Sequence, residues 1–231
     1  MKNLCIIPAR GGSKRIPRKN IKPFMGKPII AYSIEAAMKS GLFDEVMVST
    51  DDEEFAAVAR SYGAKVPFMR SKETANDYAT TVDVILEVLK GYEKLGLTFD
   101  YICCLYSTAP FVTSQKLQSA YHDMIDGGFD STYTIVEYSY PIQRSLKIED
   151  GKVSMRWPEY MRSRSQDLEK SYHDAGQFYI TEVHKFVERK ALKGNNTLGF
   201  ILSELEVQDL DTTTDWALAE IKYEAWKKNK E

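Results

Sequence analysis

The alternation of short apolar runs with segments of helical periodicity is the feature of this sequence that most restricts its fold. In the first half of the chain, apolar runs predict strands at 2–8, 45–49, 64–69 and 101–105. Helical spacing predicts helices at 28–41, 50–62, 80–95 and 113–125, the second of them with Thr50 and Glu53 at capping-box spacing. The unbroken apolar run Tyr101–Leu105 is typical of a strand inside a parallel sheet. The alternation therefore predicts an α/β protein with a mainly parallel sheet and right-handed crossovers.

The rhythm changes beyond residue 130. Strands are predicted at 131–136, 176–180 and 198–202, and helices at 181–190 and 213–228. Between them, the turn Glu149-Asp150-Gly151 separates the runs 144–148 and 152–157, which predicts a β-hairpin. No linker composition marks a second domain. We therefore interpret residues 1–231 as one domain that carries residues 138–172 as an insertion.

Composition excludes several classes of protein. The formal net charge is −2, and no apolar run approaches the about 20 residues that span a bilayer, so we expect neither a nucleic acid nor a membrane as partner. The N-terminus lacks the pattern of a signal peptide, which predicts a cytoplasmic protein. The three cysteines and three histidines show neither a disulfide framework nor a zinc spacing.

A dense run of cations follows the first predicted strand. Between residues 10 and 22 the chain has six basic residues and no acid: Arg10, Lys14, Arg15, Arg18, Lys19 and Lys22. Adjacent glycines, Gly11 and Gly12, stand at the start of this run, where backbone N–H groups can bind phosphate. The loop has neither the G-x-G-x-x-G pattern nor a Walker A spacing, which disfavours a Rossmann dehydrogenase or a P-loop NTPase. A solvated, lysine-rich surface loop is the alternative.

The predicted topology brings this loop together with other segments. Ligands of parallel α/β sheets bind at the carboxyl ends of the strands. The basic loop follows one strand, Ser49-Thr50-Asp51-Asp52 follows the second, and Tyr106–Pro110 follows another. These three segments predict a nucleotide site at one edge of the sheet.

Asp209-Leu210-Asp211 is a candidate metal site. In an extended backbone, residues two apart face the same side, so both carboxylates can bind one Mg²⁺ together with substrate phosphates. The alternative is that these acids merely precede the helix at 213–228, where Thr212 and Asp215 have the spacing of a capping box.

Taken together, these motifs resemble the acylneuraminate cytidylyltransferases, the CMP-sialic acid synthetases. The likeness begins with Pro8-Ala9-Arg10-Gly11-Gly12-Ser13-Lys14 and Lys19-Asn20, and it continues in order along nearly the whole chain. Its further members are Ser49-Thr50-Asp51, Arg70, Thr108–Pro110 and Asp209-x-Asp211. The stretches 164–168 and 172–179 resemble the branch of the family that activates pseudaminic acid. Sialic-acid members usually have Asn-Gly where this chain has Ala175-Gly176, and a glutamine where it has Tyr106.

The resemblance implies a fold and a reaction. The fold is a three-layer α/β/α nucleotide-diphospho-sugar-transferase-like domain with a β-hairpin insertion for dimerisation. The reaction transfers CMP from CTP to the anomeric hydroxyl of an acidic nine-carbon sugar, here pseudaminic acid, and releases pyrophosphate with the help of Mg²⁺. Such a product feeds surface glycans or flagellin glycosylation.

By the same resemblance, particular residues take particular roles. The catalytic set is Arg10, Lys14, Lys19 and Asp211, and the metal ligands are Asp209 and Asp211. The substrate-binding set is Ala9, Gly11, Gly12, Ser13, Asn20, Arg70, Thr81, Tyr106, Arg144, Arg164, Gln177 and Tyr179. The resemblance also implies a homodimer in which the insertion reaches onto the partner subunit and can supply a sugar-binding arginine there.

Other functions stay open at this stage. A cytidylyltransferase for legionaminic acid, N-acetylneuraminic acid or 3-deoxy-manno-octulosonate is the nearest alternative. A glycosyltransferase on the same sheet would use the carboxylate pair to cleave a sugar nucleotide, but it would have little use for a strong triphosphate loop. A regulatory module that only binds CTP leaves the carboxylate pair and the arginines of the insertion unexplained.

Overall fold

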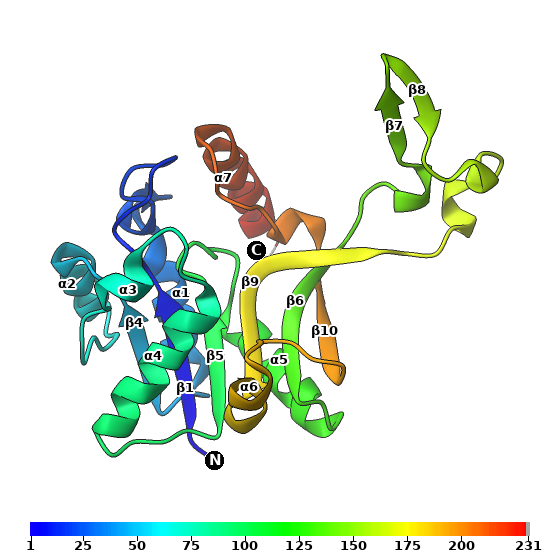
Figure 1. Ribbon diagram of the computed structural model, residues 1–231. Coiled ribbons are helices and arrows are strands. Elements are labelled where there is room, and N and C mark those ends of the chain that lie inside the picture. Colours follow the sequence, from blue (N-terminus) through cyan, green and yellow to red (C-terminus); the bar gives the residue numbers. More distant parts are fainter. Residues whose placement is uncertain (230–231) are drawn as a thin grey trace.

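The computed structural model, described here for residues 1–229, has one central sheet with helices on both faces (Figure 1). The six strands lie in the order β10-β6-β9-β5-β1-β4. Their bounds are β1 Asn3–Pro8, β4 Glu45–Ser49, β5 Tyr101–Leu105, β6 Ser131–Glu137, β9 Tyr172–Glu182 and β10 Thr197–Leu202. β4, β1 and β5 pair in parallel, as do β6 and β10, whereas β9 is antiparallel to both of its neighbours, β5 and β6. The mainly parallel α/β architecture is confirmed.

Seven helices accompany the sheet within the described residues. They are α1 Ile29–Ser40, α2 Glu53–Ser61, α3 Lys72–Ala75, α4 Thr81–Lys94, α5 Ser114–Asp126, α6 Val183–Arg189 and α7 Thr213–Lys228. Alternate residues of β1 point to opposite faces, so that Cys5 and Ile7 pack with α1, α2 and α5, whereas Leu4 and Ile6 pack with α4 and α6. A third cluster packs α7 through Trp216 against the basic loop. The two outer layers and the sheet form the three-layer arrangement.

Two local predictions are wrong. Residues 64–69 do not form a strand, and only a single bridge joins Lys65 to Met47. Pro67 has no N–H for a ladder, and Val66 and Phe68 are only partly buried, which explains why no strand extends here. The second helix is capped by Asp52, whose carboxylate accepts from the N–H groups of Glu54 and Phe55. Thr50, the cap expected from the sequence, is instead fully buried.

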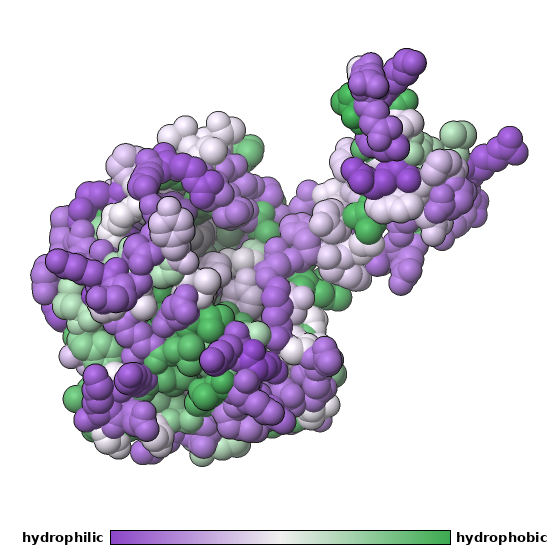
Figure 2. Space-filling view, in the orientation of Figure 1, coloured by the Kyte–Doolittle hydropathy of each residue, from purple (hydrophilic) through white to green (hydrophobic). Residues whose placement is uncertain are grey.

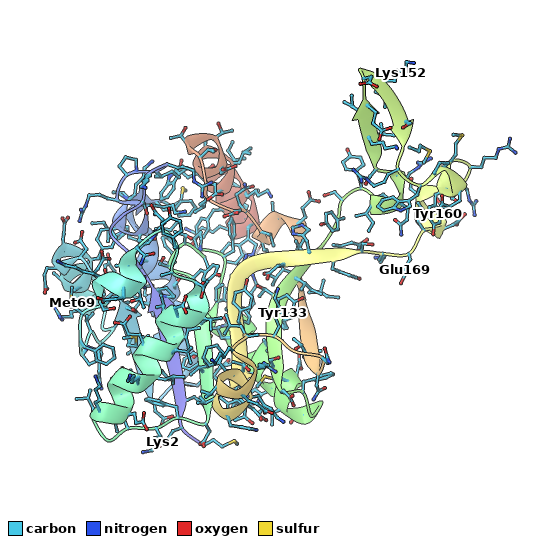
Figure 3. The ribbon with its side chains drawn as sticks, in the orientation of Figure 1. Lys2, Met69, Tyr133, Lys152, Tyr160 and Glu169 are labelled. Carbon is cyan, nitrogen blue, oxygen red and sulfur yellow. The ribbon has the colours of Figure 1, made fainter. Side chains whose placement is uncertain are left out.

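The insertion forms an arm that projects from the main body (Figure 1). It carries the antiparallel hairpin β7 (Leu146–Glu149) and β8 (Lys152–Met155), as predicted. Asp150 and Gly151 between them have φ of 51° and 75°, as a type I′ turn requires. Lys152 and Tyr160 lie far out on the arm, and Glu169 lies where the chain returns to the body (Figure 3).

The arm has no core of its own. No residue between 138 and 172 is buried, and apolar surface is visible along the arm (Figure 2). The largest exposed apolar side chains in this segment include Tyr140, which is 85% exposed, and Ile148, which is 73% exposed. Since such a hairpin buries nothing against its own subunit, this apolar surface is unusual for a monomer.

Candidate active site

Two cavities adjoin at the carboxyl ends of the parallel strands. Pro8 ends β1 beside the first cavity, Tyr106 follows β5, and Val136 near the end of β6 lines the second. Tyr106 and Thr108 line both cavities and form their shared wall. The structure therefore has two adjoining polar hollows at the predicted location, the strand ends.

We call the first one the basic cavity. It measures about 540 Å³, and its cations greatly outnumber its acids. The charged residues that line it are Arg10, Lys14, Arg15, Lys19, Arg70 and Asp77, and Ser13, Asn20, Thr80 and Thr81 are among its polar ones. A hollow of this size and charge suits a polyphosphate.

Asp77 pairs with two of the basic cavity's cations. Its Oδ1 lies 2.7 Å from Arg10 Nη1, and its Oδ2 lies 2.5 Å from Lys14 Nζ. These hydrogen bonds lower the pKa of the Asp77 carboxyl. The loop that carries Asp77 runs between α3 and α4, so two cations of the first loop are tied to a segment more than 60 positions away. Sequence reasoning missed this residue, because an aspartate in an unpatterned loop gives no local signal.

Lys19 is directed at the Asp209–Asp211 segment. Its Nζ donates to the Leu210 carbonyl at 2.7 Å and lies 3.9 Å from Asp211 Oδ1. Arg15 Nη1 contacts Asp211 Oδ2 at 2.7 Å. Burial lowers the pKa of Lys19, although Asp211 and Asp209 oppose that shift. A partly desolvated lysine that lines the basic cavity and lies beside Asp211 is a candidate for charge stabilisation.

A buried polar framework holds the basic loop against the sheet. Asn20 Nδ2 donates to the Arg10 carbonyl at 3.0 Å, and Ser107 Oγ donates to Asn20 Oδ1 at 2.9 Å. Arg70 is 8% exposed and fixed by Ser49, through Nε to Oγ at 3.0 Å and Nη2 to the carbonyl at 2.7 Å. These contacts place the side chains of both loops at the cavity before any ligand arrives.

The glycine pair lies beside the basic cavity rather than on its wall. Neither Ala9, Gly11 nor Gly12 lines it, whereas the neighbouring Ser13 does. The Gly11 N–H donates to Asp51 Oδ1 at 2.9 Å, and a Cβ on Gly11 would come within 3.0 Å of Asp52 Oδ2. In this structure, Gly11 therefore allows close packing of the loop on the Asp51-Asp52 turn.

The second hollow we call the acidic cavity. It measures about 430 Å³ and is lined by four carboxylates, those of Glu137, Asp174, Glu204 and Asp209. Within residues 1–229, Lys222 is the one lysine that lines it, and its ammonium group donates to the carbonyls of Glu204 at 3.2 Å and Val207 at 2.8 Å. Neutral groups on its wall include Thr108, Ser139 and Gln208. The charged groups on its wall are thus mainly acidic, whereas those of the basic cavity are mainly cationic.

The predicted sugar-side residues fall in three different places. Tyr106 is on the shared wall, where its hydroxyl is hydrogen-bonded to Thr81 and Tyr179. Gln177 is 4% exposed and lies behind the wall, with Nε2 donating to the Glu206 carbonyl at 2.5 Å. Tyr179 is also buried and donates to Asp174 Oδ1 at 2.8 Å.

The two arginines of the arm do not reach either cavity of their own subunit. Arg164 forms a two-bond pair with Asp167, at 2.7 Å and 3.0 Å, and Arg144 donates to Ser165 Oγ at 2.9 Å. Neither lines a cavity wall. The structure therefore brings together the basic loop, Arg70, Thr81, Tyr106 and Asp209, but not the arm.

Asp209 and Asp211 supply two carboxylates, which are only part of a cation-binding site. Asp209 is exposed on the acidic cavity, Leu210 is buried between the acids, and Asp211 is paired with Arg15. Across residues 1–229, no group of three or more acidic, histidine or cysteine side chains could hold a metal ion. In the usual Mg²⁺ arrangement, one or two carboxylates are completed by substrate phosphate oxygens, and this segment supplies only the carboxylates. Asp215 has the structural role predicted for it, as the partner of Thr212 in the capping box of α7.

Comparisons with known proteins agree on one family. Residues 4–195 match the family model described as Cytidylyltransferase. The chain is 46% identical over 224 residues to "Pseudaminic acid cytidylyltransferase" of Campylobacter jejuni (serotype O:2), covering 96% of this chain and 97% of that protein. It is 32% identical over 228 residues to "CMP-N,N'-diacetyllegionaminic acid synthase" of Legionella pneumophila, covering 95% of each.

A solved structure supports the same fold. The structure of CMP:2-keto-3-deoxy-manno-octonic acid synthetase complexed with CTP superimposes with a TM-score of 0.67 at 18% identity, covering 99% of this chain and 100% of that one. Among the described helices of the present chain, none has the length and apolarity needed to cross a membrane.

Proposed function

The chain belongs to the cytidylyltransferase family, and we propose that it transfers CMP from CTP to the anomeric hydroxyl of pseudaminic acid, a nine-carbon α-keto acid sugar. Pyrophosphate is the second product. The observation that carries this proposal is the pair of cavities joined at Tyr106 and Thr108. One is lined mainly by cations, and the other by carboxylates and neutral polar groups. The 46% identity to a protein named for that activity supports the choice of sugar.

The basic cavity has the residues needed to bind the triphosphate. Arg10 and Lys14 are close enough to bind one anionic group together, since the Asp77 carboxylate bridges them. Lys19, at the edge toward Asp211, is placed to neutralise charge that develops on the departing pyrophosphate. Asn20 and Arg70 hold the loops in position, so that these cations need little rearrangement on binding.

The shared wall positions the reacting groups. A sugar in the acidic cavity and a triphosphate in the basic cavity meet at Tyr106 and Thr108, where the hydroxyl can approach the α-phosphorus in line. Asp209 and Asp211 would hold Mg²⁺ together with phosphate oxygens, and the ion would supply charge neutralisation there. Asp211, which accepts a hydrogen bond from Arg15, is also the candidate to accept the proton of the sugar hydroxyl.

A second copy of the chain completes the site in this proposal. Among the residues that the structure describes, none of the acidic cavity's lining offers an uncommitted lysine or arginine for the sugar's own carboxylate, and an arginine fork binds a carboxylate best. The arm, which includes Arg144 and Arg164, projects from the main body of its subunit, and the apolar side chains of its hairpin are exposed. We therefore propose a homodimer, acting in the cytoplasm, in which the arm of one subunit covers the acidic cavity of the other.

The substrate assignment has a direct test. Purified protein with CTP and Mg²⁺ is offered pseudaminic, legionaminic, N-acetylneuraminic and 3-deoxy-manno-octulosonic acids in turn, and pyrophosphate release is followed. We expect the highest kcat/KM with pseudaminic acid. Preferential turnover of another acid contradicts the choice of sugar, and no release with any acid contradicts the activity itself.

The arm's contribution has a separate test. We expect an Arg164→Ala subunit and a Lys19→Ala subunit, each nearly inactive alone, to recover activity when they are mixed into heterodimers. In the trans arrangement, one of the two sites of such a dimer contains both wild-type residues. Verified heterodimers with no recovery would show that the arm acts on its own subunit or not at all.

A further inference from the structure

Asp174 is the most firmly held carboxylate of the acidic cavity. Its Oδ1 accepts from the Tyr179 hydroxyl at 2.8 Å and from the Gly176 N–H at 2.9 Å, and its Oδ2 accepts from Lys193 Nζ at 2.8 Å. The side chain remains 32% exposed and lines the cavity. A carboxylate has about four acceptor positions, so three bonds leave one for a ligand.

The partners of Asp174 come from behind the cavity wall. Lys193 reaches it from the loop between α6 and β10, with its ammonium group 4.5 Å from the ring centroid of Tyr133. The rings of Tyr133, seen on β6 in Figure 3, and Tyr179 are stacked at 5.8 Å and 5°. Partial burial works to lower the pKa of Lys193, but Asp174 outweighs it and the pKa is raised. The lysine is thus held charged against Asp174.

A backbone irregularity turns Asp174 toward the cavity. The register of β6 against β9 shifts between Tyr133 and Ile135, and Ile135 pairs with Asp174. Gly176 has a φ of 62° here, a conformation that favours glycine. The Tyr179 end of this network continues to Tyr106 on the shared wall, so Asp174 is coupled to the place where the two cavities meet.

The charge of the cavity decides which part of a sugar acid Asp174 can bind. Of its four carboxylates, Glu137 and Asp174 are paired with Lys170 and Lys193, whereas Glu204 and Asp209 have no ion pair within residues 1–229 and repel an anion. The one lysine on the wall in that part of the chain, Lys222, donates to backbone carbonyls. A sugar's N–H donors are favourable there, because a hydrogen bond to a charged acceptor is worth about twice a neutral one. The cavity therefore favours the end of the sugar that carries N–H groups over the end that carries the carboxylate.

We propose that Asp174 determines sugar specificity by accepting a hydrogen bond from an acylamino N–H of the sugar acid, with Lys193 and Tyr179 as positioning residues. This inference rests on the proposed function, since it concerns the sugar of that reaction. Asp174 contacts the substrate, whereas Lys193 acts through Asp174.

The test uses Asp174→Asn in the full-length enzyme, with steady-state kinetics for both substrates. The asparagine oxygen can keep the Tyr179 and Gly176 bonds, but its NH2 group then faces both the sugar's N–H and Lys193 Nζ, so the Lys193 hydrogen bond is lost as well. We expect the KM for the diacylamino sugar acid to rise about tenfold to a hundredfold, and the KM for CTP to stay within about twofold. Asp126→Asn, which removes an exposed carboxylate on α5 outside both cavities, is the matched control.

Sugar analogues separate a contact from a structural role. In each of two analogues, one acylamino group is replaced by hydrogen. For the analogue that lacks the Asp174 partner, wild type and Asp174→Asn should have the same KM, because neither can make the bond. An equal penalty on both analogues and the parent sugar overturns the proposal, since a distorted wall would affect all three.

Lys193 supplies a second variant that leaves the carboxylate in place. We expect Lys193→Met to raise the KM for the sugar acid about threefold to tenfold, and Lys193→Arg to restore most of the loss. Unchanged KM in Lys193→Met overturns the positioning role. Wild-type enzyme that releases no pyrophosphate with any sugar acid defeats the proposed function, whereas active wild type with an unaffected Asp174→Asn defeats this inference alone.

Discussion

The basic and the acidic cavity share a wall but are built in different ways. The basic cavity takes most of its cations from one continuous loop, residues 10–19, and its acid from the segment before α4. The acidic cavity takes its carboxylates from β6, β9 and the stretch that leads to α7, which are far apart in the chain. Opposite charge on the two sides of Tyr106 and Thr108 disfavours a polyphosphate in the acidic cavity. In our proposal, therefore, nucleotide binding is encoded locally, whereas sugar binding depends on the whole fold and on a second copy of the chain.

Lys19→Met tests the catalytic side of this comparison and should have the largest effect. It removes the partly buried ammonium group that contacts Leu210 and Asp211 at the edge of the basic cavity. We expect kcat to fall by about 10²–10³-fold, the usual cost of losing a charge stabiliser, measured by pyrophosphate release. Lys22→Met is the matched control, because Lys22 packs over the Trp216 ring at 4.5 Å and lines neither cavity. Equal losses in both variants would assign the effect to loop packing.

Asp209→Asn and Asp211→Asn test whether the boundary between the cavities binds Mg²⁺. Each should reduce kcat about 10²-fold and raise the Mg²⁺ concentration for half-maximal activity, because a hard cation prefers a charged oxygen ligand. Asp215→Asn weakens the capping box of α7 and the 3.2 Å hydrogen bond from the Asp211 N–H to Asp215 Oδ2. It should lower the free energy of unfolding by about 1 kcal/mol and reduce kcat far less than the other two variants. Near-normal rates in both Asp209→Asn and Asp211→Asn would show that these two acids do not bind Mg²⁺ and merely precede the N-terminus of α7.

The difference between the cavities also explains what the sequence could and could not predict. The positions of contiguous features were predicted correctly, because spacing along the chain determines their geometry. Examples are the loop from Arg10 to Asn20 at the strand ends and the Asp150-Gly151 turn. Gln177 and Tyr179 were expected to line the sugar pocket, but both are buried behind the wall of the acidic cavity, and Asp174, on the other side of the register shift from Tyr179, lines the cavity instead. Periodicity cannot reveal such a shift in register.

Contacts between distant segments were missed for a similar reason. Asp77 meets Arg10 only because the segment between α3 and α4 folds over the strand ends. Lys193 meets Asp174 from a loop with no motif of its own. The strand expected at 64–69 fails because Pro67 and partial burial outweigh its apolar composition.

Asp77→Asn tests whether the Asp77 carboxylate competes with the triphosphate for Arg10 and Lys14. Triphosphate binding at Arg10 and Lys14 must compete with Asp77, so its neutralisation should lower the KM for CTP by about twofold to fivefold. The KM for the sugar acid should not change, because Asp77 does not line the acidic cavity. Glu73→Gln on α3 serves as the control for removal of an exposed acid nearby. A higher KM for CTP would instead show that Asp77 orients the cations for the nucleotide.

Glu206→Gln should have the smallest effect and tests the wall behind the acidic cavity. Glu206 Oε1 accepts from Trp226 Nε1 at 2.6 Å and lies 2.7 Å from Lys116 Nζ, while its carbonyl holds Gln177. Partial burial works to raise its pKa, but Lys116 and Trp226 outweigh that and lower it below the usual 4.5. The carboxylate therefore contributes stability above about pH 4.5, and this contribution is lost as the pH falls through the lower folded-state pKa.

We accordingly expect Glu206→Gln to lower the free energy of unfolding by about 1 kcal/mol at pH 7, a melting shift of about 3 °C. The difference from wild type should shrink toward zero as the pH falls below 4.5. Glu224→Gln, on an exposed position of α7, is the control. If the wall of the acidic cavity depends on this carboxylate, the KM for the sugar acid should rise modestly at pH 7 while the KM for CTP stays constant. A change in both would show that the two cavities are not mechanically independent, and that the shared wall at Tyr106 transmits strain from one to the other.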